Sequence, residues 1–200
     1  MKAICRGEVM GKYLKLMDGL KSNAGGFQYK IGEVNVADNW NPTTFDPVIM
    51  GGFNFSTEEK ILRWIHRGDT VYDVEIPKDA EVIDCPSENC PHGVFRTNKI
   101  ILSNPRKLTE DMVMEYYRKS DLPIKTYYQC IVVMIYKNYL NIDKKIIEYK
   151  VDKNNIYDCI NEFEIMISDK HDGSIPIFKY HELWKEAKEI YNILVNIKNS

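Results

Sequence analysis

The sequence predicts an α+β fold, in which a β-rich N-terminal domain is followed by a helical C-terminal half. In the first half, apolar and polar residues alternate with the period of two that is typical of strands, and glycines and prolines separate the segments. In the second half, apolar residues recur at the 3.6-residue spacing of helices. Strands first and helices afterwards indicate segregated layers and not an alternating parallel sheet. We therefore expect domains at 1–107 and 108–200, with the boundary near Asn104–Leu108.

The composition is that of a soluble globular protein, with 44% hydrophobic and 28% charged residues. A net charge of −2 provides no general attraction to nucleic acid or to an anionic membrane, and neither is an expected partner. The longest apolar stretch, Cys130–Tyr136, is far shorter than the roughly 20 residues of a transmembrane helix. The N-terminus lacks the apolar core of a secretory signal. The five scattered cysteines fit a reducing compartment, so we expect an intracellular protein that is neither secreted nor transmembrane.

The β-rich half is expected to contain one helix, over Thr57–Arg67. Ser56 is its predicted N-cap, Glu59 completes a capping-box pattern, and Gly68 ends it. A short extended piece is expected at Ala80–Ile83. The segments predicted as strands are Tyr13–Met17, Phe27–Val36 with an interruption at Gly32, Phe53–Phe55, Val71–Ile76, and Val94–Leu102, which Pro105 would end.

The helical half is predicted to contain about five helices. The run Ile131–Val133 within the second of them is β-branched, so that Cys130–Tyr136 also fits a strand. The apolar stripe of the last helix includes Trp184 and Tyr191, and it either closes the protein's own core or joins two copies, so that monomer and homodimer both stay open. The expected helices are Glu110–Lys119 capped by Thr109, a helix with Pro123 in its first turn that continues through Tyr127–Ile135, Lys144–Val151, Ile156–Ile167, and Tyr180–Val195.

The loop Ala37–Met50 carries two large aromatic residues, Trp40 and Phe45, although its prolines and asparagines are typical of a connection. Large aromatic side chains are costly to leave in water. We therefore expect the loop to pack onto the domain, and Trp40 and Phe45 are the candidate anchors for a binding partner.

A cluster of potential metal ligands lies between two predicted strands. Cys85, Cys90 and His92 fall within eight residues and offer up to three zinc ligands. A fourth ligand is not evident and the spacing matches no standard zinc knuckle, so the alternative is a proline-rich hairpin loop. The other patterns are weaker: Gly51–Ser56 lacks the lysine of a phosphate-binding loop, and His181–Lys185 lacks the second histidine of a zinc protease. The sequence therefore predicts no catalytic residue and no cofactor other than zinc.

Five motifs occur along the first half of the chain in this order: Gly26–Val36, Asn41-Pro42, Gly51–Phe55, Val74–Val82 and Thr97–Leu102. Over about Tyr13–Leu102 the chain resembles a large paralogous family that giant DNA viruses of amoebae, the mimivirus-like group, encode. Many members carry ankyrin repeats after this domain, whereas residues Leu108–Ser200 resemble the short-tailed branch, because no motif recurs at a period of about 33 residues.

The resemblance implies a viral origin but no activity and no functional residues. We therefore expect a non-enzymatic protein-interaction module that meets an unknown host or viral protein in the host cytoplasm or in the virion. The alternative is a divergent ADP-ribosyltransferase-like enzyme that uses NAD. This alternative rests on Gly51–Thr57, a helix and Val71–Pro77, which loosely follow the order of elements in that superfamily.

Overall fold

The computed structural model describes residues 12–22, 26–44, 46–87, 90–167 and 184–200, and it confirms the α+β class. The chain forms two compact units, Met1–Asp121 and Leu122–Ser200. The predicted boundary near Asn104–Leu108 marks the change from strands to helices. The division between the units comes one helix later, because α2 (Glu110–Lys119) packs against η1 (Glu58–Arg67) within the first unit.

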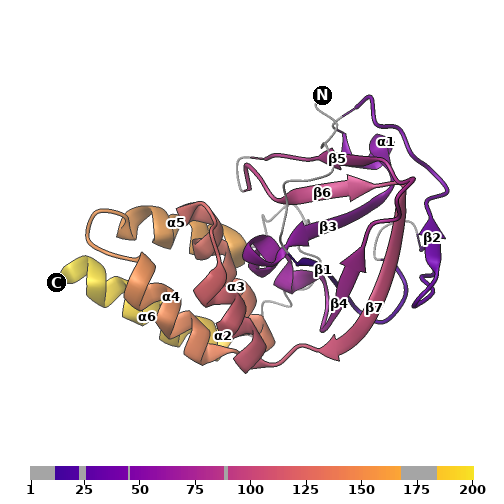
Figure 1. The fold of residues 1–200 in the computed structure, drawn as a ribbon. Helices are drawn as coiled ribbons and strands as arrows, with labels where there is room; N and C mark the ends of the chain where they lie inside the picture. The colour runs from indigo at the N-terminus through magenta and orange to yellow at the C-terminus, as the bar shows by residue number, and fades with distance from the viewer. Residues whose placement is uncertain (1–11, 23–25, 45, 88–89, 168–183) are drawn as a thin grey trace. The chain divides into compact units, whose positions relative to one another are not determined.

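The first unit is built on one antiparallel sheet of seven strands (Figure 1). The order across the sheet is β2-β7-β4-β1-β3-β6-β5, so β1 lies at the centre and β2 and β5 lie at the two edges. The strands are β1 (Tyr13–Met17), β2 (Val34–Val36), β3 (Phe53–Thr57), β4 (Thr70–Glu75), β5 (Val82–Asp84), β6 (Val94–Thr97) and β7 (Lys99–Lys107).

Alternating residues of these strands build two apolar layers. One is rich in aromatic residues, and the partly buried Tyr13 packs against it edge to face, with its ring centroid 5.1 Å from that of Phe55. The other contains η1, whose Ile61, Leu62 and Ile65 are fully buried. The aromatic layer consists of Met17, Tyr29, Phe53, Phe55, Tyr72, Phe95, Ile100 and Leu102.

The predicted strand Val94–Leu102 is wrong as a single element, because β6 and β7 are separate strands with Asn98 between them. Nor does Pro105 end β7. The pairing of β7 with β4 shifts around Asn104 and Pro105, and Asn104 adopts a left-handed φ of 47°. Such a β-bulge tolerates proline, because a residue in it does not need to donate an N–H hydrogen bond to the neighbouring strand.

The predicted helix at Thr57–Arg67 exists, but it differs in type and in capping. It is a 3₁₀ helix of 10 residues, and Ser56 lies in β3 instead of capping it. Thr57 is the N-cap and makes no capping hydrogen bond with its side chain. Gly68 ends the helix for a packing reason, since a Cβ atom there would lie 2.0 Å from the carbonyl carbon of Met17.

The remaining N-terminal predictions are confirmed in part. The strand predicted at Phe27–Val36 is reduced to β2, and Gly32 interrupts the segment with a φ of +74°. The end of the segment Ala37–Met50, predicted as a loop, forms the short helix α1 (Pro47–Met50), and the Asp46 carboxylate caps it by accepting from the Val48 N–H at 2.8 Å.

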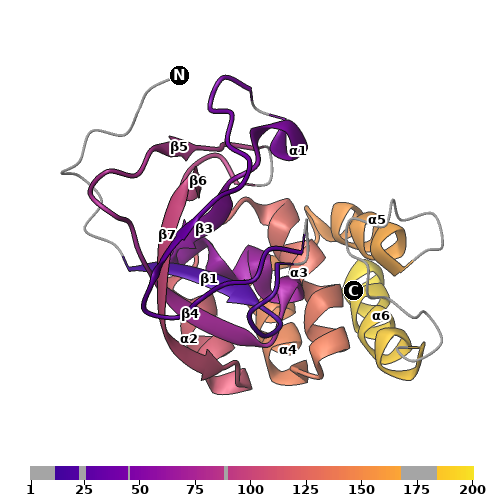
Figure 2. The ribbon, with the colours of Figure 1, turned by 90° about the vertical axis from the view of Figure 1, so that its right-hand side faces the viewer.

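The second unit is helical, and Figure 2 shows its helices in orange to yellow. Cys130–Tyr136 lies within α3, which resolves the choice between helix and strand. No described helix is long and apolar enough to cross a membrane. Tyr180 and Leu183, at the predicted start of the last helix, lie outside the described residues. The helices are α3 (Ile124–Lys137), α4 (Leu140–Lys150), α5 (Ile156–Ile167) and α6 (Trp184–Asn199).

Candidate functional site

Trp40 is tied to the sheet unit, as expected of an aromatic loop that packs onto its domain. Its indole Nε1 donates to Glu81 Oε2 at 2.5 Å, and a Cβ atom on Gly52 would lie 2.6 Å from the indole ring. The side chain is half-buried in this position. Phe45, the second candidate anchor, lies outside the described residues. The role of both residues in binding a partner therefore stays a prediction.

The three predicted zinc ligands follow one another along the hairpin between β5 and β6 but point to different partners. The Cys85 thiol lies 3.9 Å from the Met50 sulfur, and the buried Cys90 thiol donates to the main-chain oxygen of His92 at 3.3 Å. His92 Nδ1 lies 3.9 Å from an Asp84 carboxylate oxygen. Among the described residues, no three His, Cys, Asp or Glu side chains gather as a metal site.

The most unusual chemical environment lies where β1 and β3 separate. These strands pair only at Tyr13–Thr57 and Leu14–Ser56, although β3 continues to pair with β6 on its other side. The Thr57 N–H donates to a β6-side oxygen, that of Gly93, at 3.0 Å. Because the direction of hydrogen bonding alternates along an antiparallel strand, the Asn54 carbonyl points toward β1. In the described part of the chain, the pairing of β1 with β3 does not extend to Asn54.

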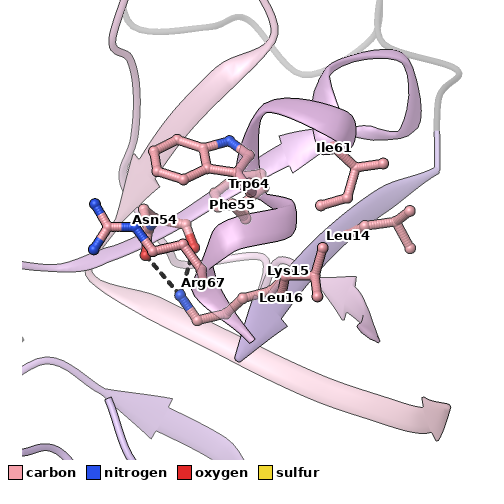
Figure 3. Close-up of a pocket in the computed structure, with 8 residues that line it drawn as sticks. All are labelled: Leu14, Lys15, Leu16, Asn54, Phe55, Ile61, Trp64 and Arg67. Atoms are coloured by element: carbon pink, nitrogen blue, oxygen red, sulfur yellow. Dashed lines mark hydrogen bonds between the residues drawn. The ribbon is translucent and has the colours of Figure 1, made fainter. Parts of the chain in front are cut away.

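Lys15 fills this gap with its side chain. Its ammonium donates to the main-chain oxygen of Asn54 at 2.7 Å and to Asn54 Oδ1 at 2.7 Å (Figure 3). The residue is only 6% exposed, and the amine lies 5.5 Å from the centre of the Tyr29 ring. No carboxylate in the described part of the chain forms an ion pair with it. A single amine thus takes the place of the missing strand partner.

A small pocket adjoins the Lys15 side chain, with room for roughly one water molecule. Three of its lining residues, Ile61, Trp64 and Arg67, are spaced by three in η1. A 3₁₀ helix has three residues per turn, so residues at this spacing form one row along its surface. Figure 3 shows this row together with Lys15 and Asn54.

Positive charge dominates the surroundings of Lys15. Burial, and after it the charges of Arg96 and Arg67, lower the pKa of the Lys15 ammonium to about 7. Burial also lowers the pKa of the Arg67 guanidinium, which lies 5.7 Å from the centre of the Trp64 ring. Arg96 donates to the main-chain oxygen of Gly51 at 2.5 Å. A substantial fraction of Lys15 is therefore an uncharged amine at neutral pH.

This arrangement combines a nucleophile with a preference for negative charge. An uncharged lysine amine attacks electrophilic carbon, and burial among cations is a general way to produce one. The same cations would stabilise an anion beside the amine. We therefore regard Lys15 with Arg67 and Arg96 as the main candidate chemical site.

This site was not among those that the sequence predicts. The only signal was the segment Tyr13–Met17, in which a lysine stands among apolar residues, and a lysine at such a position is usually taken to face solvent. Which residues surround it depends on the separation of β1 from β3 and on η1. Both are properties of the assembled fold.

A second candidate surface is the edge formed by β2. The side chains of Val34 and Val36 are exposed there, whereas Asn35 between them is buried and bonds the Lys30 main chain through its amide. The Ala37 N–H donates to the Asn98 oxygen of the β7 side at 2.9 Å. By alternation, the main-chain groups of Val34 and Val36 point away from β7. In the described part of the sheet no strand lies beyond β2.

Comparison with known proteins adds no assignment. No protein-family model, no curated protein and no solved structure matches the chain.

Proposed function

We propose that this protein is a non-enzymatic protein-interaction module, and that it binds an extended segment of a host or viral protein along β2. In this proposal it belongs to the giant-virus family that its N-terminal motifs resemble, and it acts in the host cytoplasm or in the virion. The observation that supports the proposal most directly is the open edge of β2 with its two exposed valines.

An open edge strand attracts a further strand for a general reason. Its outward N–H and C=O groups are already ordered in the geometry that a partner strand requires, so strand addition gains hydrogen bonds at little entropic cost. Val34 and Val36 lie on one face of β2 and would contact alternate side chains of the added strand. The neighbouring Lys30 and Glu33 pair with each other at 3.5 Å, so the edge carries little net charge. An uncharged, apolar segment fits this surface best.

The proposal is tested by the double substitution Val34→Lys and Val36→Lys. Lysine on an edge strand opposes strand addition, and both positions are exposed, so the fold is expected to survive. The tagged wild-type chain should capture a partner from infected amoebae, and the double variant should capture it at least about tenfold less well. Hydrogen exchange of the Val34 and Val36 amides should slow when the partner is added.

Ile165→Lys is the matched control, because Ile165 is an exposed aliphatic residue of α5 in the other unit. It should leave capture unchanged. Equal capture by wild type and by the β2 variant would reject the proposed surface.

The NAD-dependent alternative is separated by thermal denaturation. A ligand at 100 times its dissociation constant adds about 2.7 kcal/mol to the free energy of unfolding. A clear rise in the melting temperature in millimolar NAD would favour the ADP-ribosyltransferase-like enzyme over the interaction module.

A further inference from the structure

We propose that Lys15 is a carbamylation site, at which the amine combines reversibly with dissolved carbon dioxide. This inference is independent of the β2 surface. It starts from the position of the amine, which adjoins a pocket and bonds to neutral oxygens only among the described residues.

The reaction requires only the amine and carbon dioxide. The Nζ lone pair of the uncharged lysine attacks the carbon atom, a C–N bond forms, and one π bond of carbon dioxide opens to give a carboxylate. One N–H proton leaves to solvent, and no oxidation or reduction takes place. The product is Lys15 Nζ–COO⁻. An ordinary lysine reacts poorly at neutral pH because almost all of it is protonated.

The size of the pocket selects the reagent. A pocket with room for roughly one water molecule is too small for most metabolites that carry an aldehyde or an activated acyl group, so the smallest carbon electrophiles are favoured. The walls include Leu14, Leu16 and Ile61, so the pocket is mostly apolar. Carbon dioxide is small and uncharged, and it can enter such a pocket without a desolvation penalty.

The charges around the amine favour the product. A new carboxylate in a buried site is costly unless positive charge compensates it. Arg96 and Arg67 are the charges that act most on Lys15, and both favour the uncharged amine over the ammonium and the carbamate over the amine. The carbamate keeps one N–H, which can still donate to the main-chain oxygen of Asn54. The same surroundings therefore favour both the uncharged amine that reacts and the carbamate that forms.

The full-length protein is tested by equilibration with ¹³C-bicarbonate near pH 7.5. A trialkyloxonium salt then converts any carbamate into a stable ester, and peptide mass spectrometry locates the label. The expected result is labelling of the Lys15 peptide at least about tenfold above the peptides of other lysines, because the uncharged fraction of the Lys15 amine is far larger than that of an ordinary lysine. Lys60 serves as an internal control, since it is also buried but pairs with Asp121. An unlabelled Lys15, or equal labelling of Lys15 and Lys60, would overturn the proposal.

Two further variants test the role of the charges. Arg67→Gln should reduce the labelling of Lys15 several-fold by removing one of the two cations that act on it. Arg63→Gln is the matched control. The Arg63 guanidinium carbon also lies over the Trp64 ring, 5.0 Å from its centre, but Arg63 is not among the charges that lower the pKa of Lys15. Equal labelling in the two variants would contradict the role given to Arg67. The ¹³C spectrum of the intact wild type should contain a carbamate resonance that is missing from the spectrum of Lys15→Met.

Discussion

Lys15 and Lys60 are both buried in the sheet unit, with 6% and 8% of their surfaces exposed, yet they are accommodated in opposite ways. Lys60 reaches from η1 to the Asp121 carboxylate at 2.9 Å and to the main-chain oxygen of the same residue. Among the described residues Lys15 donates only to the two oxygens of Asn54, and the charges that lower the pKa of its ammonium are those of Arg96 and Arg67. The comparison teaches that two lysines buried to a similar degree in one unit can have opposite surroundings: a carboxylate beside Lys60, and neutral oxygens with arginine charges around Lys15.

The largest expected effect is the contribution of Lys15 to the pH dependence of stability. The pKa of its ammonium is about 7 in the folded chain and near the ordinary 10.5 after unfolding. Between these values the unfolded chain binds a proton that the folded chain does not, so the free energy of unfolding rises with pH. We expect a rise of about 2 kcal/mol from pH 6.5 to pH 8.5 in urea titrations.

This rise should be absent from Lys15→Met and present in Lys60→Met. Other titrating groups are common to the two variants, so their contributions cancel in the difference. The assignment of the rise to Lys15 fails if Lys15→Met retains the wild-type slope.

A smaller effect is expected from Asn54→Asp, which gives Lys15 the kind of partner that Lys60 has. A carboxylate at hydrogen-bond distance favours the ammonium, so the pKa of Lys15 should rise. The increase in unfolding free energy between pH 6.5 and 8.5 should then fall by about 1 kcal/mol or more. Urea titrations at both pH values measure this change, and carbamate labelling of Lys15 should fall with it. An undiminished slope would show that the neutral Asn54 side chain is not what distinguishes the two lysines.

The smallest effect is expected from Asp121→Asn, which removes the carboxylate from the Lys60 site. The Asp121 side chain is 89% exposed, so solvent screens the pair, and the main-chain oxygen remains as an acceptor. We expect the free energy of unfolding to fall by about 1 kcal/mol or less. In 1 M salt the wild type and the variant should become similar in stability, because salt screens exposed charges. A loss of several kcal/mol that persists in salt would place the Lys60 pair among fully buried ion pairs.

The predictable parts of the fold are those that neighbouring residues specify. Thr109 caps α2 as expected, with its hydroxyl accepting from the Met112 N–H at 3.3 Å. The strand Tyr13–Met17 has the bounds that its alternation predicts. In α2 the capping partner lies three positions along the chain, and in β1 the short apolar-rich segment itself marks the bounds, although its strand partners are distant.

The parts that could not be predicted depend on partners far along the chain. Ser56 has the residue type of an N-cap but lies in β3, because pairing with Leu14 and Val94 extends the strand through it. Pro105 would normally end a strand, yet the bulge in β7 accommodates it. The environment of Lys15 likewise combines β1, β3, β6 and η1. The spacing of residues within Tyr13–Met17 does not indicate which residues of the other elements surround Lys15.

The threefold repeat of η1 has a consequence for how this protein can change over time. In a helix with three residues per turn, each inserted or deleted residue rotates all later side chains by about 120°. Substitutions between Glu58 and Arg67 can leave the row Ile61, Trp64 and Arg67 in place, whereas a change in length by one residue would turn Arg67 away from Lys15. We expect related sequences that keep the lysine to vary in composition along this segment but to conserve its length.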